Sequence, residues 1–457
     1  MTRAEPSHGT SSSEVGDAEL QDGSREVRRV AVSGFLGNMI EIYDFVLYGS
    51  AAALVLGPLF FGNLSPALAT IASFSTLATG FIARPIGGMV FGYLGDRVGR
   101  KAVLISTLTL MGVASGLIGM LPTRSAIGVA APILLIVLRL LQGIAAGGEW
   151  GGSVLMIAEH SDGRRRGFYS ALGQAGMPAG SILASLALAA VTLLPRDQLL
   201  SWGWRIPFLA SFVLLAISLY VRSRISESPL FVESGPAARG GRAILGTLFG
   251  SNLGALLRAF AISIPIPLAG TVFGSFTIAY ATTKGHSQPS VLLAFTIGLA
   301  VSIVLMPFSG ALTDRIGRRP VFIAAAVTFA IVAYPFFLVI GLGSTPLMYV
   351  AFIVVISVVA VGMQGALAQF LSELFPLRTR SLGVSIAYQC SGVVAGLAPL
   401  VGASLLAVAG AAMGIVWVAL ITAVLGLLAA LAAWRSSESN GVSLAASGAE
   451  SPALASP

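Results

Sequence analysis

The sequence is poor in charge and in the residues that most often carry catalysis. Only 10% of its 457 residues are charged, whereas soluble globular domains carry about 25%. It has one cysteine, Cys390, and three histidines that lie far apart along the chain. These scarcities exclude a disulfide framework and argue against a metal cluster built on Cys or His. The phosphate-binding pattern Gly-x-x-x-x-Gly-Lys is also missing, which excludes an ATP-driven motor of that type. We therefore expect no enzymatic activity, no metal and no cofactor.

Apolar residues, in contrast, make up 56% of the chain and gather in long runs. A helix of roughly 20 apolar residues crosses a bilayer and satisfies its own backbone polar groups there. The pattern predicts an all-α membrane protein with twelve transmembrane helices in two six-helix halves. The expected spans lie near residues 30–56, 67–91, 102–121, 131–157, 167–194, 204–221, 256–281, 290–312, 320–342, 347–371, 382–407 and 411–434.

The basic residues are distributed as in such a membrane protein. With both termini placed in the cytoplasm, 21 of the 27 Lys and Arg residues fall on the cytoplasmic side, four fall outside and two lie within spans. Basic loops mark the cytoplasmic side of a bilayer. We therefore predict that both termini are cytoplasmic. The net charge of +8 is attributed to topology, and nucleic-acid binding is not expected.

One charged loop occurs twice, 218 residues apart. Gly92-Tyr-Leu-Gly-Asp-Arg-Val-Gly-Arg-Lys101 returns as Gly310-Ala-Leu-Thr-Asp-Arg-Ile-Gly-Arg-Arg319. Each copy separates two apolar runs, which indicates that the halves arose by duplication. The expected organisation is a disordered tail over 1–29, halves over 30–221 and 256–435, an inter-half loop over 222–255 and a second disordered tail over 436–457.

These loops match the signature of the major facilitator superfamily, and four further segments resemble its metabolite:proton symporter family. The segments are Gly37-Asn-Met-Ile-Glu-Ile-Tyr-Asp-Phe45, Ala83-Arg-Pro-Ile-Gly-Gly88, Arg139-Leu-Leu-Gln-Gly-Ile-Ala-Ala-Gly-Gly-Glu-Trp-Gly-Gly152 and Glu373-Leu-Phe-Pro-Leu-Arg-Thr-Arg380. Two features depart from the family pattern. Ile42 stands where a Trp is usual, and the middle of the seventh span, usually polar, reads Ser263-Ile-Pro-Ile-Pro-Leu-Ala-Gly270. We expect Pro265 and Pro267 to break or kink that span.

The resemblance implies a secondary transporter of the bacterial inner membrane that imports a small polar metabolite with a proton by alternating access. The substrates that the resemblance implies are di- and tricarboxylates, shikimate-like acids, or zwitterions such as proline and betaine. We favour an organic anion, with a zwitterion symporter or a proton-driven efflux carrier as alternatives. A receptor that binds without transport is disfavoured, because neither tail is long or apolar enough to fold as a signalling domain. The expected partners are substrate, proton and the lipid bilayer, and we expect a monomer.

Three acidic residues lie inside the expected spans, where a charge costs at least roughly 2.5 kcal/mol. Glu41 and Asp44 share one face of the first span with Asn38 and Tyr48, because their spacing follows the helical repeat. That face must meet protein or a water-filled cavity. We expect Glu41 or Asp44 to take up the coupled proton, since burial favours the neutral form of a carboxyl. Glu149 is the next candidate. The alternative is a structural patch of hydrogen bonds.

Arg139 in the fourth span is the predicted substrate grip, because a guanidinium binds a carboxylate with two hydrogen bonds. It shares a helical face with Glu149 but lies about 15 Å from it along the axis, so each needs another partner. We expect Arg139 to be the counter-charge of Glu41 or Asp44. The alternative is that it only neutralises them.

Other predicted contacts fall into three groups. Arg84 is expected to be structural, reaching the inner interface or capping a helix. Isolated amides and hydroxyls can line the passage or join helices, and the predicted substrate contacts besides Arg139 are Asn38, Tyr48, Gln142, Gln174 and Gln364. The two charged loops are predicted to gate the passage at the cytoplasmic face, through Asp96, Arg97, Arg100, Asp314, Arg315 and Arg318.

Overall fold

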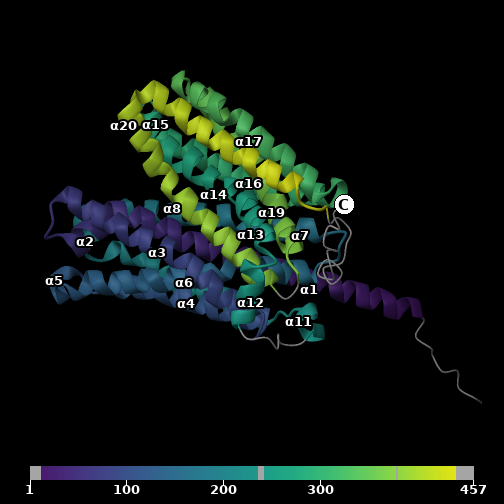
Figure 1. Ribbon diagram of the computed structural model, residues 1–457. Helices are drawn as coiled ribbons and strands as arrows, with labels where there is room; N and C mark the ends of the chain where they lie inside the picture. The colour runs from purple at the N-terminus through teal and green to yellow at the C-terminus, as the bar shows by residue number, and fades with distance from the viewer. Residues whose placement is uncertain (1–11, 235–240, 377–378, 439–457) are drawn as a thin grey trace, which may run out of the picture.

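The chain folds into a bundle of helices (Figure 1). The structure is a computed structural model that describes residues 12–234, 241–376 and 379–438, and the regular elements of these residues are all helical. Eleven helical segments in them are long and apolar enough to cross a membrane. The last, α20 (Arg380–Trp434), has 55 residues and holds Gly410 in a non-helical conformation, with φ of 77° and ψ of 163°. Figure 1 shows α20 turning back on itself, so it supplies two spans and the predicted twelve are confirmed.

The amino-terminal half contains six spans. Its first helix begins at Ser12, so residues 12–29, which we expected to be a disordered tail, lengthen that helix instead. Residues 1–11 lie outside the described part. The elements are α1 (Ser12–Ala51), the π-helical η1 (Ala52–Leu56), α2 (Gly57–Phe61), α3 (Pro66–Gly95), α4 (Arg100–Met120), α5 (Arg124–Ile127), α6 (Ala130–His160), α7 (Arg166–Gln174), α8 (Gly176–Thr192), α9 (Arg196–Gln198), the π-helical η2 (Leu199–Gly203) and α10 (Arg205–Ser223).

Two short helices, α11 (Pro229–Ser234) and α12 (Gly241–Phe249), occupy the segment where the sequence predicted a loop. Residues 439–457, most of the expected carboxyl-terminal tail, lie outside the described part. The elements of the second half are α13 (Leu253–Ser263), α14 (Pro265–Ala269), the π-helical η3 (Gly270–Phe276), α15 (Thr277–Thr283), α16 (Gln288–Ile316), α17 (Arg318–Gly341), α18 (Thr345–Phe352), the π-helical η4 (Ile353–Ala360), α19 (Val361–Leu374) and α20.

The predicted break in the seventh span is confirmed. Helix α13 ends at Ser263, and α14 begins at Pro265, which has no N–H to donate to the preceding turn. The π-helical segment η3 follows directly. The span therefore crosses the half as two α-helical pieces and one π-helical piece before α15, in place of one regular helix.

The outside of the bundle is apolar. Ile71, Phe308 and Ile331 are 60%, 66% and 66% exposed. A soluble protein does not display many large apolar side chains in this way. The exposure fits a surface that meets lipid tails, where long apolar helices are stable.

Both charged loops turn at a glycine. Gly99 has φ of 108° and Gly317 has φ of 99°, a region that strains any residue with a Cβ. The two glycines are equivalent positions of the sequence repeat, and helices α4 and α17 begin directly after them. The loops lie at one end of the bundle, called the charged end below.

Each of these helix starts is capped by a distant carboxylate. Glu227 accepts hydrogen bonds from the backbone N–H groups of Arg100 (2.8 Å) and Lys101 (3.1 Å). Glu438 accepts from those of Arg318 (3.2 Å) and Arg319 (2.9 Å). The first N–H groups of a helix have no partner within the helix, so these carboxylates complete both turns. The sequence repeats here as well: Arg224-Ile-Ser-Glu-Ser228 matches Arg435-Ser-Ser-Glu-Ser439, which the sequence reasoning had missed.

Helices α3 and α6 touch backbone to backbone. A Cβ at Gly143 of α6 would collide with the carbonyl group of Gly80 on α3. This close approach brings Arg84 of α3 and Arg139 of α6 to the same side of α1. Glycine packing of α6 against α3 thus helps to position these buried charges.

The two halves approach each other at the charged end and diverge towards the opposite end (Figure 1). Helix α20 of the second half runs antiparallel against α3, with Ser381 beside Gly95, Leu382 beside Gly92 and Ser385 beside Gly88. Helix α16 meets α7 where Gly310 lies against Gly167. Small residues therefore line the seam between the halves.

Candidate functional site

The polar stripe on α1 is buried along its whole length. Asn38, Glu41, Asp44 and Tyr48 are each at most 1% exposed. The Asn38 amide donates to the carbonyl of Gly173 on α7 at 2.9 Å, which joins two helices. Tyr48 shares a short hydrogen bond with Thr76 of α3. The two ends of the stripe therefore hold neighbouring helices, and the two carboxylates lie between them.

Glu41 is paired with Arg84. The distance from Arg84 Nη2 to Glu41 Oε1 is 3.0 Å, and both side chains are buried. Neither oxygen of Glu41 accepts a geometrically sound hydrogen bond from any described residue. We expected Arg84 to be a structural residue that reaches the inner interface. The structure instead places it in a buried ion pair. Its side chain lies against α1, with Glu41 and the Phe45 ring as its partners.

Asp44 has a different environment. The Ser211 hydroxyl of α10 donates to Asp44 Oδ1 at 2.8 Å. Its second oxygen, Oδ2, has no hydrogen-bond partner in the described part of the chain. Asp44 and Arg139 are not joined by an ion pair within 4.0 Å among the described residues, so the predicted direct pairing is absent from this conformation.

Arg139 lies against aromatic rings. Its guanidinium carbon is 4.0 Å from the centroid of Phe45 and 4.3 Å from that of Tyr48. Its Nη1 donates to Gln142 Oε1 at 3.0 Å, and Gln142 in turn donates to Ser115. Arg139 is fully buried, and its Nε and Nη2 find no acceptor in the described residues. Cation–π attraction and one amide thus take the place of the carboxylate that we expected.

Glu149 lies in a separate buried cluster nearer the charged end. Arg222 of α10 donates to both of its oxygens, one of these bonds being short and the other 3.0 Å, and the Thr107 hydroxyl donates at 2.7 Å. Sequence reasoning counted Arg222 as a loop residue and missed this pair. A usable signal was present: Ser211, Ser218 and Arg222 lie seven and four residues apart, which makes a polar stripe on α10.

Aromatic and amide groups meet between the halves. Trp150 of α6 stacks on Tyr388 of α20 with centroids 3.5 Å apart and planes 8° from parallel. The indole N–H of Trp150 donates to Gln174 Oε1 at 2.9 Å. Gln364 donates to the sulfur of Met177 at 2.9 Å, again across the seam. The predicted contacts Gln174 and Gln364 therefore lie at the inter-half surface, whereas Asn38, Tyr48 and Gln142 are enclosed within the first half.

The ion pairs of the first charged loop lie within its own half, and Arg380 of the second half adds a further positive charge near Asp96. Arg100 pairs with Asp96 at 2.7 Å and with Glu159 at 3.4 Å. Burial raises the pKa of Asp96 to about 6, although the adjacent Arg100 opposes that rise. Arg97 lies over the ring of Tyr93, 5.2 Å from its centroid.

The second charged loop joins the halves. Asp314 accepts hydrogen bonds from the backbone N–H groups of Gly167 (2.7 Å) and Phe168 (3.0 Å) in the first half. Arg166 pairs with Glu373 at 3.0 Å, also across the seam. Arg318 lies 3.5 Å from Asp314. Arg315, in contrast, is exposed. The loops are thus alike in sequence and differ in what they hold together.

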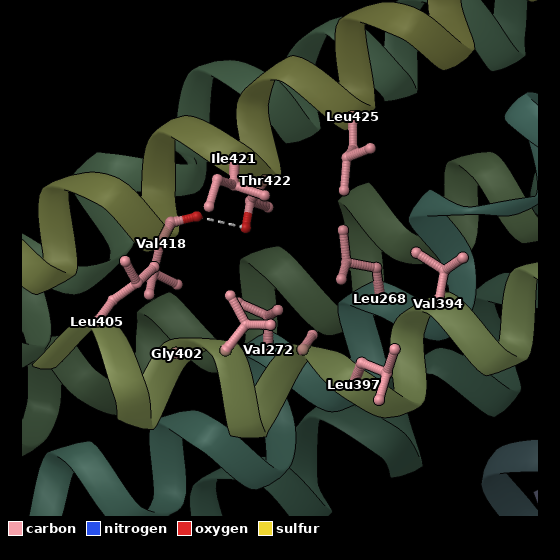
Figure 2. A pocket seen from close by; sticks show the side chains of 12 residues that line it. Leu268, Val272, Val394, Leu397, Gly402, Leu405, Val418, Ile421, Thr422 and Leu425 are labelled. Carbon is pink, nitrogen blue, oxygen red and sulfur yellow. Dashed lines mark hydrogen bonds between the residues drawn. The ribbon is translucent and has the colours of Figure 1, made fainter. Parts of the chain in front are cut away.

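One cavity of about 210 Å³ lies in the second half, away from all of these charges. It is lined by apolar side chains of α14, η3 and both limbs of α20 (Figure 2). Its single hydroxyl, on Thr422, donates to the carbonyl of Val418 at 2.8 Å. A cavity without a free polar group does not suit a polar metabolite.

A bundle of two six-helix halves with buried ion pairs is the architecture of a membrane transporter, and known proteins agree. Residues 30–253 match the family described as "Sugar (and other) transporter", and residues 251–455 match "Major Facilitator Superfamily". The chain is 38% identical over 388 residues to the shikimate transporter of Escherichia coli (strain K12), covering 83% of this chain and 88% of that protein. It is 30% identical over 428 residues to the proline/betaine transporter of Salmonella typhimurium, covering 91% and 84%.

Solved structures share the fold. The proton:xylose symporter XylE bound to 6-bromo-6-deoxy-D-glucose has a TM-score of 0.74 at 19% identity, covering 93% of this chain and 98% of that one. The inward-open xylose transporter XylE from E. coli has a TM-score of 0.61 at 20% identity, covering 92% and 98%. The chain belongs to the major facilitator superfamily. It is a multi-pass membrane transporter of the metabolite-transporting kind and not an enzyme.

Proposed function

We propose that this transporter imports a small organic anion together with a proton, by alternating access between its two halves. The observation that carries the proposal is the buried pair of Glu41 and Arg84. A carboxylate and a guanidinium in this setting form a switch, because an arginine keeps its proton and a carboxylate does not. When Glu41 takes up a proton, Arg84 becomes free to bind the carboxylate of a substrate.

Arg84 suits this role better than Arg139, which we first expected to grip the substrate. Arg84 is 7% exposed and Arg139 is 0% exposed. Tyr388 of the facing half lies near enough to Arg84 and Glu41 for both charges to act on it. A substrate between the halves therefore meets Arg84 first. Arg139 lies deeper in the first half and would act as the fixed positive charge near Asp44.

Asp44 is the second carboxylate in the proposed proton pathway. Serine hydroxyls are its hydrogen-bond partners and Arg139 acts on it without forming an ion pair, so its charge is less directly compensated than that of Glu41. Glu149 is a weaker candidate than we first expected. It accepts three hydrogen bonds, two of them from Arg222, so its oxygens are already engaged in holding α4, α6 and α10 together.

The substrate class follows from the same arginine. A guanidinium selects a carboxylate, and the shikimate transporter is a relative at 38% identity. A zwitterion such as proline or betaine is the second candidate, because it also carries a carboxylate and transporters of that kind are 30% identical to this chain. The charged end is proposed to face the cytoplasm, in keeping with the distribution of Lys and Arg. The described conformation is then closed towards the cytoplasm.

Purified protein in proteoliposomes tests the proposal. Labelled shikimate, citrate, α-ketoglutarate, proline and betaine are offered under an imposed pH gradient, acid outside. One coupled proton supports about tenfold accumulation per pH unit. We expect accumulation of one carboxylate, its loss in Glu41→Gln, and retained exchange of labelled for unlabelled substrate in that variant. Accumulation that needs the opposite gradient would indicate efflux, and a Glu41→Gln variant that still concentrates substrate would refute the assignment of Glu41.

A further inference from the structure

Two arginines from different helices share one aromatic ring. The guanidinium carbon of Arg84 lies 3.8 Å from the centroid of Phe45, and that of Arg139 lies 4.0 Å from the same centroid. The negative π-cloud of Phe45 is therefore shared by two positive charges.

Arg84 forms an ion pair with one carboxylate of α1, whereas Arg139 acts on the other, Asp44, without an ion pair. Arg84 pairs with Glu41, one turn before Phe45 on the same helix. Arg139 lies beside Tyr48, one turn after Asp44, and also contacts Phe45. Phe45 thus contacts both a set that faces the seam between the halves and a set that is enclosed within the first half. The enclosed set is tightly packed, since a Cβ at Gly80 would lie 2.8 Å from Arg139 Nε.

We propose that Phe45 is a positioning residue that couples the two charged sets, so that a change of charge at Glu41 and Arg84 is transmitted to Arg139 and Asp44. This inference rests on the proposed proton-coupled import. When a substrate carboxylate draws Arg84 away from Phe45, the ring loses one of its two cations. The ring and Arg139 then settle into a new position, because Arg139 has no ion-pair partner among the described residues to hold it.

Simple packing is the competing explanation. Phe45 is buried among Ile40, Leu108 and Ala145, and it meets the Phe81 ring edge-on at 5.2 Å. If packing were its whole role, an aliphatic side chain of similar size would lower stability and leave the proton-to-substrate ratio unchanged. If the ring couples the sets, the ratio must change while binding and exchange survive.

The experiment compares Phe45→Leu with Phe45→Tyr and Phe81→Leu. Phe81 is a matched control, because its ring contacts Arg84 at 5.2 Å but is not part of the contact with Arg139. The probe is the carboxylate that wild-type protein accumulates, with shikimate tested first. In Phe45→Leu we expect accumulation driven by a pH gradient to lose most of the roughly tenfold per pH unit that one coupled proton supports. Exchange without a gradient should stay near the wild-type rate.

Phe45→Tyr and Phe81→Leu should both keep the wild-type ratio. The inference is overturned if Phe45→Leu accumulates substrate as wild type does, if Phe81→Leu loses coupling equally, or if Tyr fails to restore it. If Phe45→Leu does not fold, Phe45→Met replaces it, with the same expectations. Failure of the proposed function is a different result, because wild-type protein itself would then show no accumulation driven by a pH gradient, and the coupling role would fail with it.

Discussion

Each buried carboxylate in the first half is compensated by different neighbouring side chains. Glu41 has an arginine, Asp44 has a serine hydroxyl, and Glu149 has an arginine and a threonine. These differences matter because the cost of a buried charge depends on how completely it is compensated. The well-bonded Glu149 is suited to holding helices together, and the sparsely bonded Glu41 is suited to changing its protonation.

The pair of Glu149 and Arg222 is expected to be a stability element. Arg222→Met leaves the Glu149 carboxylate buried without its main partner, and breaking a buried pair in this way costs about 3–5 kcal/mol. We predict a large drop in the melting temperature of Arg222→Met in detergent, measured by intrinsic fluorescence. The double variant Arg222→Met with Glu149→Gln should recover part of the loss. A single variant as stable as wild type would contradict this role.

At the scale of elements, two loops with the same sequence pattern make different contacts. The loop between α3 and α4 forms its ion pairs within its own half, through Asp96, Arg100 and Glu159. The loop between α16 and α17 reaches across the seam, because α16 packs on α7 and brings Asp314 to the first N–H groups of that helix. The helix start supplies unpaired donors, and a carboxylate there is favoured.

Asp314 is therefore predicted to control the opening of the charged end. Asp314→Asn weakens the acceptor of two N–H groups that link the halves. We expect exchange to slow about tenfold, as for a change of roughly 1.4 kcal/mol, while equilibrium binding of substrate is nearly unchanged. Labelling of a cysteine placed at Ala171, with Cys390→Ser, should rise because Ala171 packs against Gly310 at the seam.

Two further variants distinguish the effect of the contact between the halves from the effect of losing an acidic side chain in this region. Asp162→Asn, an exposed acid next to α7, is the control and should leave exchange and labelling unchanged. Asp96→Asn should slow exchange without exposing Ala171→Cys, since the ion pair of Asp96 with Arg100 lies within the first half and Ala171 packs at a different contact. Assays at pH 7.5 keep Asp96 charged, as its pKa is about 6. Loss of equilibrium binding as the main effect of Asp314→Asn would show that gating is the wrong assignment.

The whole molecule is a pair of similar halves that are closed together at the charged end. The sequence repeat, the two left-handed glycines and the two capping carboxylates all occur once in each half. The polar stripe and the buried carboxylates inside the spans, Glu41, Asp44 and Glu149, however, belong to the first half, whereas the second half has an apolar cavity and an interrupted seventh span, with its buried charges near the charged end. The fold is thus symmetric and the proposed chemistry is not.

Orientation in the membrane is the prediction at this scale. With Cys390→Ser as background, single cysteines at Gly62, Lys284 and Thr345 should react with an impermeant thiol reagent added outside cells. A cysteine at Gly163 should react only after permeabilisation. The reason is the excess of Lys and Arg at the charged end. Outside labelling of Gly163→Cys would reverse the orientation, and with it the proposed direction of import.

The sequence alone determined the class of the molecule. Hydropathy runs, the loop repeat and the spacing of Asn38, Glu41, Asp44 and Tyr48 are local properties of one chain, so they predicted the twelve spans, the two halves and the polar face of the first helix. Local spacing also showed that Arg139 and Glu149 are too far apart to pair.

Only the tertiary structure decided which charges meet. Glu41 pairs with Arg84 and Glu149 with Arg222 because glycine contacts set how closely the helices approach and at which height their side chains face each other. The same packing put two arginines against the ring of Phe45, which no spacing along one helix reveals. Partners across helices depend on the rotation and vertical offset of each helix, and these are fixed by the sum of many contacts rather than by any single segment.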